Sequence, residues 1–177
     1  GIVELLHGDT VRCIVKKKDP ISVLPADSSS RVSGLALDYQ GNLWITLVIA
    51  DYRLNVLDAE GNWHYWPFSS AYPIGILIDD YGTKWINNQG QGILVMNESG
   101  TLADKSDDQS RTITSDAGNG GLPNNSVLCI EKDLDGAVWV GTSEGAVVFY
   151  DPGSIFSSSA PDASCPLVEG YCLLRDQ

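Results

Sequence analysis

The sequence is short of charge, of long apolar runs and of basic residues. Charged residues make up 19% of the 177 residues, against roughly 25% in a typical soluble domain, which excludes a charged coiled coil. The longest apolar run, residues 43–50, is strand-sized and far below the roughly 20 residues of a membrane helix. Only 11 Lys and Arg oppose 23 Asp and Glu, and the net charge of −12 repels phosphate backbones. We therefore expect no membrane insertion of this segment and no nucleic-acid partner.

The residue spacings of common metal and catalytic sites are also missing. The four cysteines form no CxxC pair, which disfavours a zinc ribbon or a thioredoxin-type site. Cys129 lies in an apolar strand and is expected in the core, while Cys165 and Cys172 flank a short turn and are either paired or free. Neither His7 nor His64 belongs to a nucleophile or metal motif, and no phosphate loop is present. We predict no catalytic residue, no metal, no cofactor and no enzymatic activity.

What the sequence does contain is an internal repeat with intervals of roughly 40 to 55 residues. In each copy an Asp is followed by a Gly and then a Trp in the same register. A short apolar run precedes the Asp and the Trp strand follows the Gly, which indicates antiparallel strands joined by a tight hairpin. A repeat of this length made of strands is typical of β-propeller blades. The recurring residues are Asp38, Gly41 and Trp44, then Asp79, Gly82 and Trp85, then Asp133, Gly136 and Trp139.

These recurring residues are interpreted as structural. The Gly supplies the positive φ of the turn, and each Trp is expected to be largely buried between neighbouring blades, which favours core packing over a ligand cage. The run Asp133-Leu-Asp-Gly136 has part of the pattern of a calcium loop, but it lacks the further acidic ligands and the closing Glu. A hairpin turn is therefore favoured over a metal site.

The repeat predicts an all-β fold, a β-propeller fragment of about three and a half four-stranded antiparallel blades. A polar insert around residues 104–120 lengthens the second interval, and the outer strand of the last blade is expected within residues 155–177. The chain is a single partial propeller with a half blade at 1–30, a blade at 31–70, a blade with the polar insert at 71–120, and a blade plus a C-terminal edge at 121–177.

Two segments resemble known families. One resembles the two-component-regulator propeller repeat and reads Gly121-Leu-Pro-Asn-Asn-Ser-Val-Leu-Cys-Ile-Glu-Lys-Asp-Leu-Asp-Gly-Ala-Val-Trp-Val-Gly-Thr142. Degenerate copies without the Gly-Leu-Pro-Asn start extend this likeness over residues 32–152. The second, Asp151-Pro-Gly-Ser-Ile-Phe156 with Pro166-Leu-Val168, resembles the PorZ-like propeller component of the Bacteroidetes type IX secretion machinery. The resemblance implies an exported protein of the cell surface or periplasm that assists a sortase-like partner and engages anionic polysaccharide.

Two groups of side chains are candidates for binding. Trp63, Tyr65, Trp66 and Tyr72 cluster around a Pro-containing turn, where they either stack on sugar rings or a protein partner or pack between blades. Lys16, Lys17 and Lys18 form the one cationic run on an acidic chain, which suits an anionic glycan or simply protects a strand end.

The function that these observations favour is a non-catalytic binding or scaffold module of a cell-surface protein associated with type IX secretion. The alternative is the periplasmic sensor propeller of a hybrid two-component regulator that recognises an oligosaccharide. Both hypotheses use the same repeat, and they differ in whether the partner is a secretion assembly or a small sugar ligand.

Overall fold

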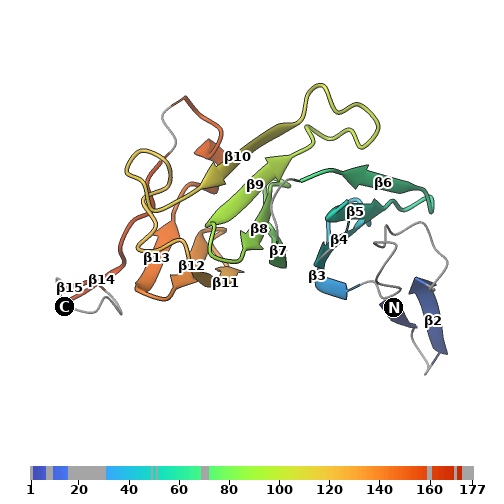
Figure 1. Ribbon diagram of the computed structural model, residues 1–177, viewed down its shortest axis with the longest axis horizontal. Helices are drawn as coiled ribbons and strands as arrows, with labels where there is room; N and C mark the ends of the chain where they lie inside the picture. Colours follow the sequence, from blue (N-terminus) through green and yellow to red (C-terminus); the bar gives the residue numbers. More distant parts are fainter. Residues whose placement is uncertain are drawn as a thin grey trace. The chain divides into compact units, whose positions relative to one another are not determined.

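The computed structural model of the chain is built from short antiparallel strands (Figure 1). It describes residues 31–48, 50, 52–68, 72–158, 161–167, 169 and 172 with their side chains, and the backbone alone of residues 2–6, 10–15, 168 and 171. The only helix in these ranges, η1 (Pro152–Ser154), is a single turn and is too short to cross a membrane. The expected all-β fold is confirmed.

The chain divides into two compact units, residues 1–73 and 74–177, and each is described by itself. The first unit holds a two-stranded hairpin and a four-stranded sheet, in which every strand pairs antiparallel with the next along the chain. The strands of the hairpin are β1 (Ile2–Leu6) and β2 (Thr10–Val15), and those of the sheet are β3 (Arg31–Leu37), β4 (Leu43–Val48), β5 (Leu54–Leu57) and β6 (Trp63–Trp66).

The second unit contains a four-stranded sheet, a three-stranded sheet and a terminal hairpin of two-residue strands. The four-stranded sheet consists of β7 (Pro73–Ile78), which starts at the boundary between the units, β8 (Lys84–Asn88), β9 (Ile93–Asn97) and β10 (Gln109–Ile113). The three-stranded sheet consists of β11 (Val127–Lys132), β12 (Val138–Thr142) and β13 (Gly145–Phe149), and the hairpin of β14 (Leu167–Val168) and β15 (Tyr171–Cys172).

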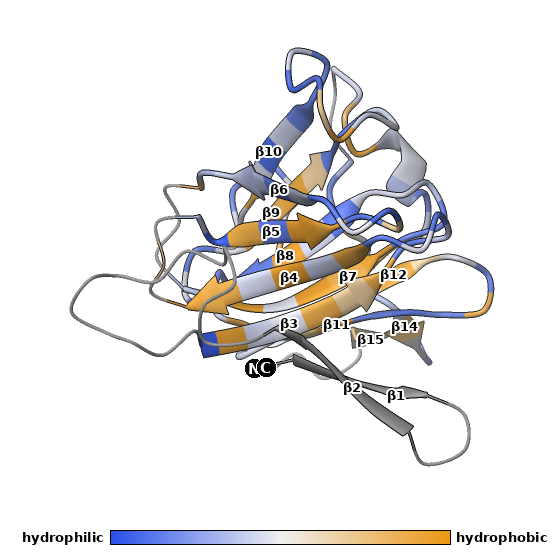
Figure 2. Ribbon diagram, turned by 90° about the vertical axis from the view of Figure 1, so that its right-hand side faces the viewer, coloured by the Kyte–Doolittle hydropathy of each residue, from blue (hydrophilic) through white to orange (hydrophobic). Residues whose placement is uncertain are grey.

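Strand β10 lies within the stretch around residues 104–120 that was expected as a polar insert. Gln109–Ile113 pairs along its whole length with β9 and forms the fourth strand of its sheet. Figure 2 shows that β10 is markedly more hydrophilic than its neighbour β9. Its composition therefore does not indicate a strand. Only Ile113, at the end of the strand, is fully buried.

In the described part of residues 155–177, the expected outer strand is reduced to a bridge. Beside β13 the chain forms a single bridge between Val148 and Ser164 instead of a strand. The chain then turns away into the β14–β15 hairpin, where a disulfide joins Cys165 to Cys172. This bond settles the two alternatives that the spacing of the cysteines leaves open.

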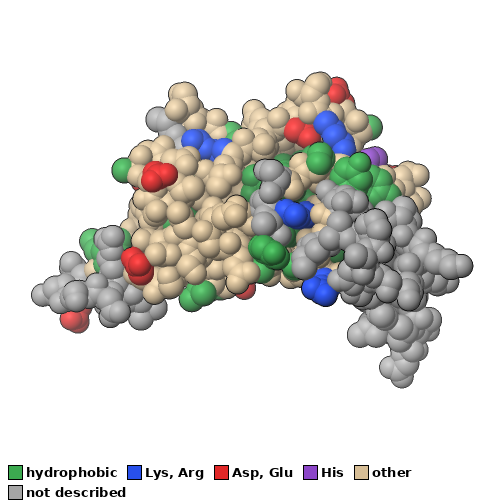
Figure 3. Space-filling view, in the orientation of Figure 1, with side chains coloured by type: hydrophobic (Ala, Val, Ile, Leu, Met, Phe, Trp, Pro, Cys, Tyr) green, Lys and Arg blue, Asp and Glu red, His purple; other side chains and the backbone are tan. Residues whose placement is uncertain are grey.

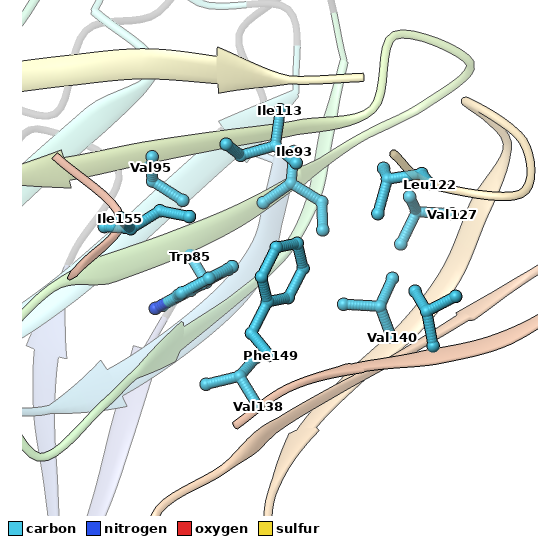
Figure 4. Close-up of a cluster of buried hydrophobic side chains, with 11 residues drawn as sticks. Trp85, Ile93, Val95, Ile113, Leu122, Val127, Val138, Val140, Phe149 and Ile155 are labelled. Atoms are coloured by element: carbon cyan, nitrogen blue, oxygen red, sulfur yellow. The ribbon is translucent and has the colours of Figure 1, made fainter. Parts of the chain in front are cut away.

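The core of the second unit lies between its two larger sheets (Figure 4). Trp85 of β8 and Phe149 of β13 meet at its centre, with ring centroids 5.1 Å apart and ring planes tilted by 51°. Valines and isoleucines from both sheets surround the pair and are almost completely excluded from solvent. Face-to-face packing of two antiparallel sheets over an apolar layer is the arrangement of neighbouring propeller blades.

The sheet of the first unit has two apolar faces, as a central blade requires. On one face Trp44 packs against Trp66, with ring centroids 5.4 Å apart. On the other face Ile45, Leu47 and Ala50 form a second buried cluster. Since successive residues of a strand point to opposite faces, Trp44 and Ile45 serve the two sides of one strand.

The three recurring turns share one hydrogen-bond geometry. In each, the Asp carboxylate accepts the indole N–H of the Trp six residues later, at 2.9 Å for Asp38, 2.8 Å for Asp79 and 2.8 Å for Asp133. The other carboxylate oxygen accepts two backbone N–H groups within the same turn. The three turn glycines, Gly41, Gly82 and Gly136, have φ between 75° and 86°, which residues with a side chain rarely adopt.

Trp139 departs from the expected burial. Trp44 and Trp85 are 0% exposed, whereas Trp139 is half-buried. Its neighbours Val138 and Val140 point into the interface with the β7–β10 sheet, so Trp139 points to the opposite face of its own sheet. The shared turn therefore fixes the position of the indole, and the packing of the sheet decides its burial.

Candidate binding surfaces

Strand β6 separates the four predicted aromatic residues instead of presenting them together. Trp66 is 5% exposed and belongs to the core through its contact with Trp44. Trp63 lies on the other face of the strand, where it packs on the cluster of Ile45, Leu47 and Ala50. These two residues are therefore used by the fold, in agreement with the packing alternative.

Tyr65 and Tyr72 keep part of their surface in contact with solvent. The Tyr65 ring lies 5.5 Å from the ring of Tyr52, and burial raises the pKa of the Tyr65 hydroxyl. Tyr52 is 43% exposed and Tyr72 is 45% exposed, so both rings offer area to a partner. Tyr52 was missed in the sequence because it lies alone in a turn, eleven residues before the Trp63–Trp66 strand. Figure 3 shows hydrophobic side chains gathered beside the histidine on one face of the chain.

The cationic candidates lie outside the described residues. Lys16, Lys17 and Lys18 follow β2, and their structure is not described. They stay a sequence prediction.

A fourth copy of the repeated turn lies between β5 and β6. It was not recognised among the internal repeats of the sequence because His64 stands where the other copies have Trp. Asp58 accepts the backbone N–H of Asn62 and lies 3.0 Å from Nε2 of His64, six residues later. His64 therefore occupies the position of the Trp in the other three turns. Burial acts to raise the pKa of Asp58, but the hydrogen bonds from His64 and Asn62 outweigh it and lower the pKa to about 2. The signal that could have found this turn is the Asp-x-x-Gly spacing at Asp58 and Gly61.

The same balance operates at the turns with tryptophan. Burial acts to raise the pKa of Asp38, yet the hydrogen bonds from Trp44, Asn42 and Gln40 hold that pKa below its usual value. At Asp133 the hydrogen bond from Trp139 is the largest effect, and it also lowers the pKa. These carboxylates stay ionised and are engaged within their own turns, so they are poor general acids.

Charged pairs in the second unit are structural as well. Lys84 at the start of β8 is 1% exposed and forms an ion pair with the Glu98 carboxylate in the loop after β9. Lys132 of β11 forms an exposed ion pair with Asp80 in the turn between β7 and β8, and it thereby links the two sheets of the unit. A buried charge needs such a partner because desolvation is costly. No set of three His, Cys, Asp or Glu side chains in the described ranges is grouped to hold a metal.

A small pocket lies beside the outer edge of β13. Its volume is about 90 Å³, and both strand residues and loop residues line it. We call it the edge pocket, and its lining consists of Gly121, Pro123, Gly145, Ala146, Val147, Ala163 and Cys165.

The expected position of Cys129 in the core is wrong. Cys129 is an exposed free cysteine on β11. The pairing of β11 with β12 shifts register between Val127 and Cys129, and this bulge moves the thiol out of the apolar layer. Cys129 instead lies beside Gly141, where a Cβ added to the glycine would come within 2.7 Å of the cysteine sulfur.

The chain is similar to known propellers in sequence and in structure. A family model described as two component regulator propeller matches residues 121–144, which include the third Asp-Gly-Trp turn. None of the curated proteins compared with the chain matches it.

Among solved structures, PorZ has a TM-score of 0.74 at 24% sequence identity, over 89% of this chain. PorZ is described as an essential bacterial surface component of the type-IX secretion system of Porphyromonas gingivalis. The likeness covers 24% of PorZ, so this chain spans about a quarter of that protein's length.

Two further similar structures have different functions. The extracellular domain of a putative one component system from B. thetaiotaomicron has a TM-score of 0.53 at 14% identity, over 90% of this chain and 18% of that one. Virginiamycin B lyase from Staphylococcus aureus, solved with quinupristin, has a TM-score of 0.52 at 14% identity, over 75% of this chain and 41% of that one. At these identities the likeness shows the fold alone. The chain is therefore a β-propeller segment that carries a two-component-regulator propeller repeat at residues 121–144.

Proposed function

We propose that the chain is a non-catalytic binding or scaffold module of an exported cell-surface protein that works with a type IX secretion assembly. The observation that carries the proposal is the use of the repeated residues. Each recurring Asp accepts hydrogen bonds within its own turn, and the tryptophans of the repeat donate to these carboxylates. The likeness to PorZ supports the choice of a secretion partner, and the fold supports a module with large sheet edges and loops for contacts.

The surface proposed for binding is the tyrosine group Tyr52, Tyr65 and Tyr72 in the first unit. Exposed tyrosine rings stack on sugars and anchor protein partners at low conformational cost, because each ring has only two side-chain torsions. Trp63 and Trp66 pack on opposite faces of β6 and hold in place the strand that carries Tyr65. The run Lys16 to Lys18 adds positive charge for an anionic polysaccharide.

A second candidate function is a sensor propeller that recognises an oligosaccharide. The observation in its favour is the match of residues 121–144 to the two component regulator propeller. Such a sensor would also bind through exposed aromatic rings, so the two candidates share a surface and differ in the size and charge of the ligand.

A binding titration separates the contributions of charge and stacking. The full chain is titrated with polygalacturonate and with dextran at low and moderate salt, together with the variants Tyr65→Ala and Lys16→Ala/Lys17→Ala/Lys18→Ala. We expect polygalacturonate binding to weaken with salt and in the lysine variant, because exposed charges are screened within about 8 to 10 Å. Tyr65→Ala is expected to weaken the binding of both polysaccharides, because both would stack on the ring. This loss should be similar at low and moderate salt, since stacking depends little on salt.

Two results would contradict the proposal. Hydrolysis or cleavage of either polysaccharide during the titration would refute the non-catalytic assignment. Unchanged binding in both variants would remove the tyrosine group and the lysine run from the site. Glu60→Gln, an exposed change on the same sheet, is the control for non-specific loss of binding.

A further inference from the structure

The outer edge of β13 is covered by residues 161–166, which we call the strap. In the part of the chain that the structure describes, β13 pairs on this side with one residue of the strap. The N–H and the C=O of Val148 both bond to Ser164, each at 2.8 Å. The β3–β6 and β7–β10 sheets have a fourth strand at this position. The strap therefore replaces a whole strand by a single point of pairing.

A loop from the connection between β10 and β11 holds the strap from the other side. Backbone groups of extended residues alternate in direction, so those of Ala163 point away from β13. The N–H of Ala163 donates to the C=O of Gly120 at 2.8 Å. The strap thus lies between β13 and the glycine loop, Gly118-Asn-Gly-Gly121. The edge pocket is the small gap that remains between the strap, this loop and β13.

The carboxylate of Asp162 fixes the strap to the glycine loop. It accepts the N–H of Gly118, which lies 2.8 Å and 3.0 Å from its two oxygens, and the N–H of Gly120 at 3.1 Å. Backbone N–H groups that converge in this way form a nest that binds anions. Glycine is required at position 120, because its φ is 107° and an added Cβ would lie 2.1 Å from the Ile113 side chain. The chain therefore builds an anion site and fills it with its own carboxylate.

We propose that the strap protects the β13 edge against strand addition by other chains, and that the Asp162 carboxylate holds it in this position. Uncovered strand edges pair with other chains, and proteins block them with short covering segments, proline and charge. The strap combines one paired residue, Pro161 and Pro166 near its ends, and the charge of Asp162. Neither proline has a backbone N–H to offer to a further strand. The inference goes beyond the proposed function, because it requires neither a partner protein nor a polysaccharide.

The role of Asp162 is tested by NMR hydrogen exchange on the full chain and on its Asp162→Ala variant. The amide of Val148 is expected to exchange about tenfold faster in the variant, because local opening of the strap then costs less free energy. The amide of Val147 is the internal control, since it points to β12 within the sheet and should exchange equally in both proteins. Unchanged exchange of Val148 would overturn the role of Asp162.

Acetate tests whether the glycine loop is an anion site. In Asp162→Ala the nest is open to a free carboxylate, so acetate is expected to shift the amide signals of Gly118 and Gly120 in a saturable way. Acetamide, which has the same shape without the charge, should shift them less. In the natural chain Asp162 fills the nest, and acetate should leave both signals in place. No response in the variant, or an equal response in the natural chain, would contradict the assigned site.

Protection of the edge is measured by light scattering over a range of protein concentrations. Asp162→Ala is expected to self-associate at lower concentration than Asp135→Ala, and acetate should reverse this difference. Asp135→Ala removes the same charge from an exposed side chain whose carboxylate forms no hydrogen bond among the described residues. If circular dichroism shows that Asp162→Ala is unfolded, Asp162→Asn takes its place. Equal self-association of the two variants would overturn the protective role of the strap.

Discussion

At the scale of single residues, the carboxylate of the Asp-x-x-Gly turn recurs most often as an organising group. At Asp38, Asp79 and Asp133 it accepts two backbone N–H groups and one indole N–H. At Asp58 it accepts the backbone N–H and the side-chain amide of Asn62 and lies 3.0 Å from the imidazole of His64. A carboxylate in such a turn replaces contacts with water by charge-assisted hydrogen bonds. The turn therefore tolerates a change of its ring partner, provided that the partner donates from the same place.

Asp58 gives a prediction about pH. Its pKa in the folded chain is about 2, below the usual value of 3.8, so the stabilisation by Asp58 is complete above pH of about 4 and is lost as the pH falls toward 2. We expect Asp58→Asn to be less stable than the natural chain at pH 6 and the difference to shrink between pH 4 and 2. Urea unfolding at several pH values measures this difference. A difference for Asp58→Asn that stayed constant over this pH range would contradict the assigned hydrogen bonds.

Gly92 gives a prediction about backbone space. Its φ is 83°, and a Cβ added there would lie 2.1 Å from the backbone oxygen of Ile113 in β10. We expect Gly92→Ala to reduce the free energy of unfolding by about 3 kcal/mol or more, since a rigid strand must move in addition to the strain at positive φ. Gly90 is a matched control, because its φ is 72° and nothing lies within 4 Å of an added Cβ.

Gly90→Ala should cost only the strain at positive φ, which is about 1 kcal/mol. Thermal or urea unfolding of both variants measures the comparison. Equal losses for the two variants would mean that β10 does not pass closely over Gly92.

At the scale of elements, some strands can be predicted from the sequence more readily than others. Strands with two buried faces, such as β4 and β8, directly follow an Asp-x-x-Gly turn, which predicts them. Strand β10 has one polar face and one buried residue, so its pairing with β9 identifies it and its composition does not. The outer position beside β13 holds a single bridge because Pro166 follows Ser164 closely and cannot extend the ladder.

Burial of the repeat tryptophans gives a prediction at this scale. Trp85 and Trp139 donate to their Asp residues at the same distance, 2.8 Å, but Trp85 is 0% exposed and Trp139 is half-buried. We expect Trp85→Ala to cost about 3 to 5 kcal/mol and Trp139→Ala roughly half of that, because less apolar area and a smaller cavity are involved.

Urea unfolding followed by circular dichroism compares the two variants. Both lose the same hydrogen bond to an Asp, so the difference between their free energies of unfolding reports the difference in burial. If Trp139→Ala proved as costly as Trp85→Ala, another surface would have to cover Trp139 in solution.

At the scale of the whole molecule, the propeller fold does not determine the chemistry. A secretion component, the extracellular domain of a putative one component system and a lyase have this fold in common at 14% to 24% identity with the chain. Function in such folds lies in grafted side chains and edges. For this chain the net charge of −12 disfavours nucleic acid, and the rings of Tyr52 and Tyr72 are among its exposed apolar side chains.

The sequence by itself determined the strand content, the turns and the blade repeat of this protein. Asp, Gly and Trp at fixed spacing act within a dozen residues, so local hydrogen bonds and φ preferences decide their structure. The tertiary structure alone decided which rings are buried, that Cys129 is exposed and that Cys165 pairs with Cys172. It also decided that the chain beside β13 forms a bridge between Val148 and Ser164. Burial depends on which face of a sheet meets another sheet, and pairing over long separations leaves no periodic signal in the sequence. The spacing of seven residues between Cys165 and Cys172 allows both a paired and a free state, so only the folded chain decides between them.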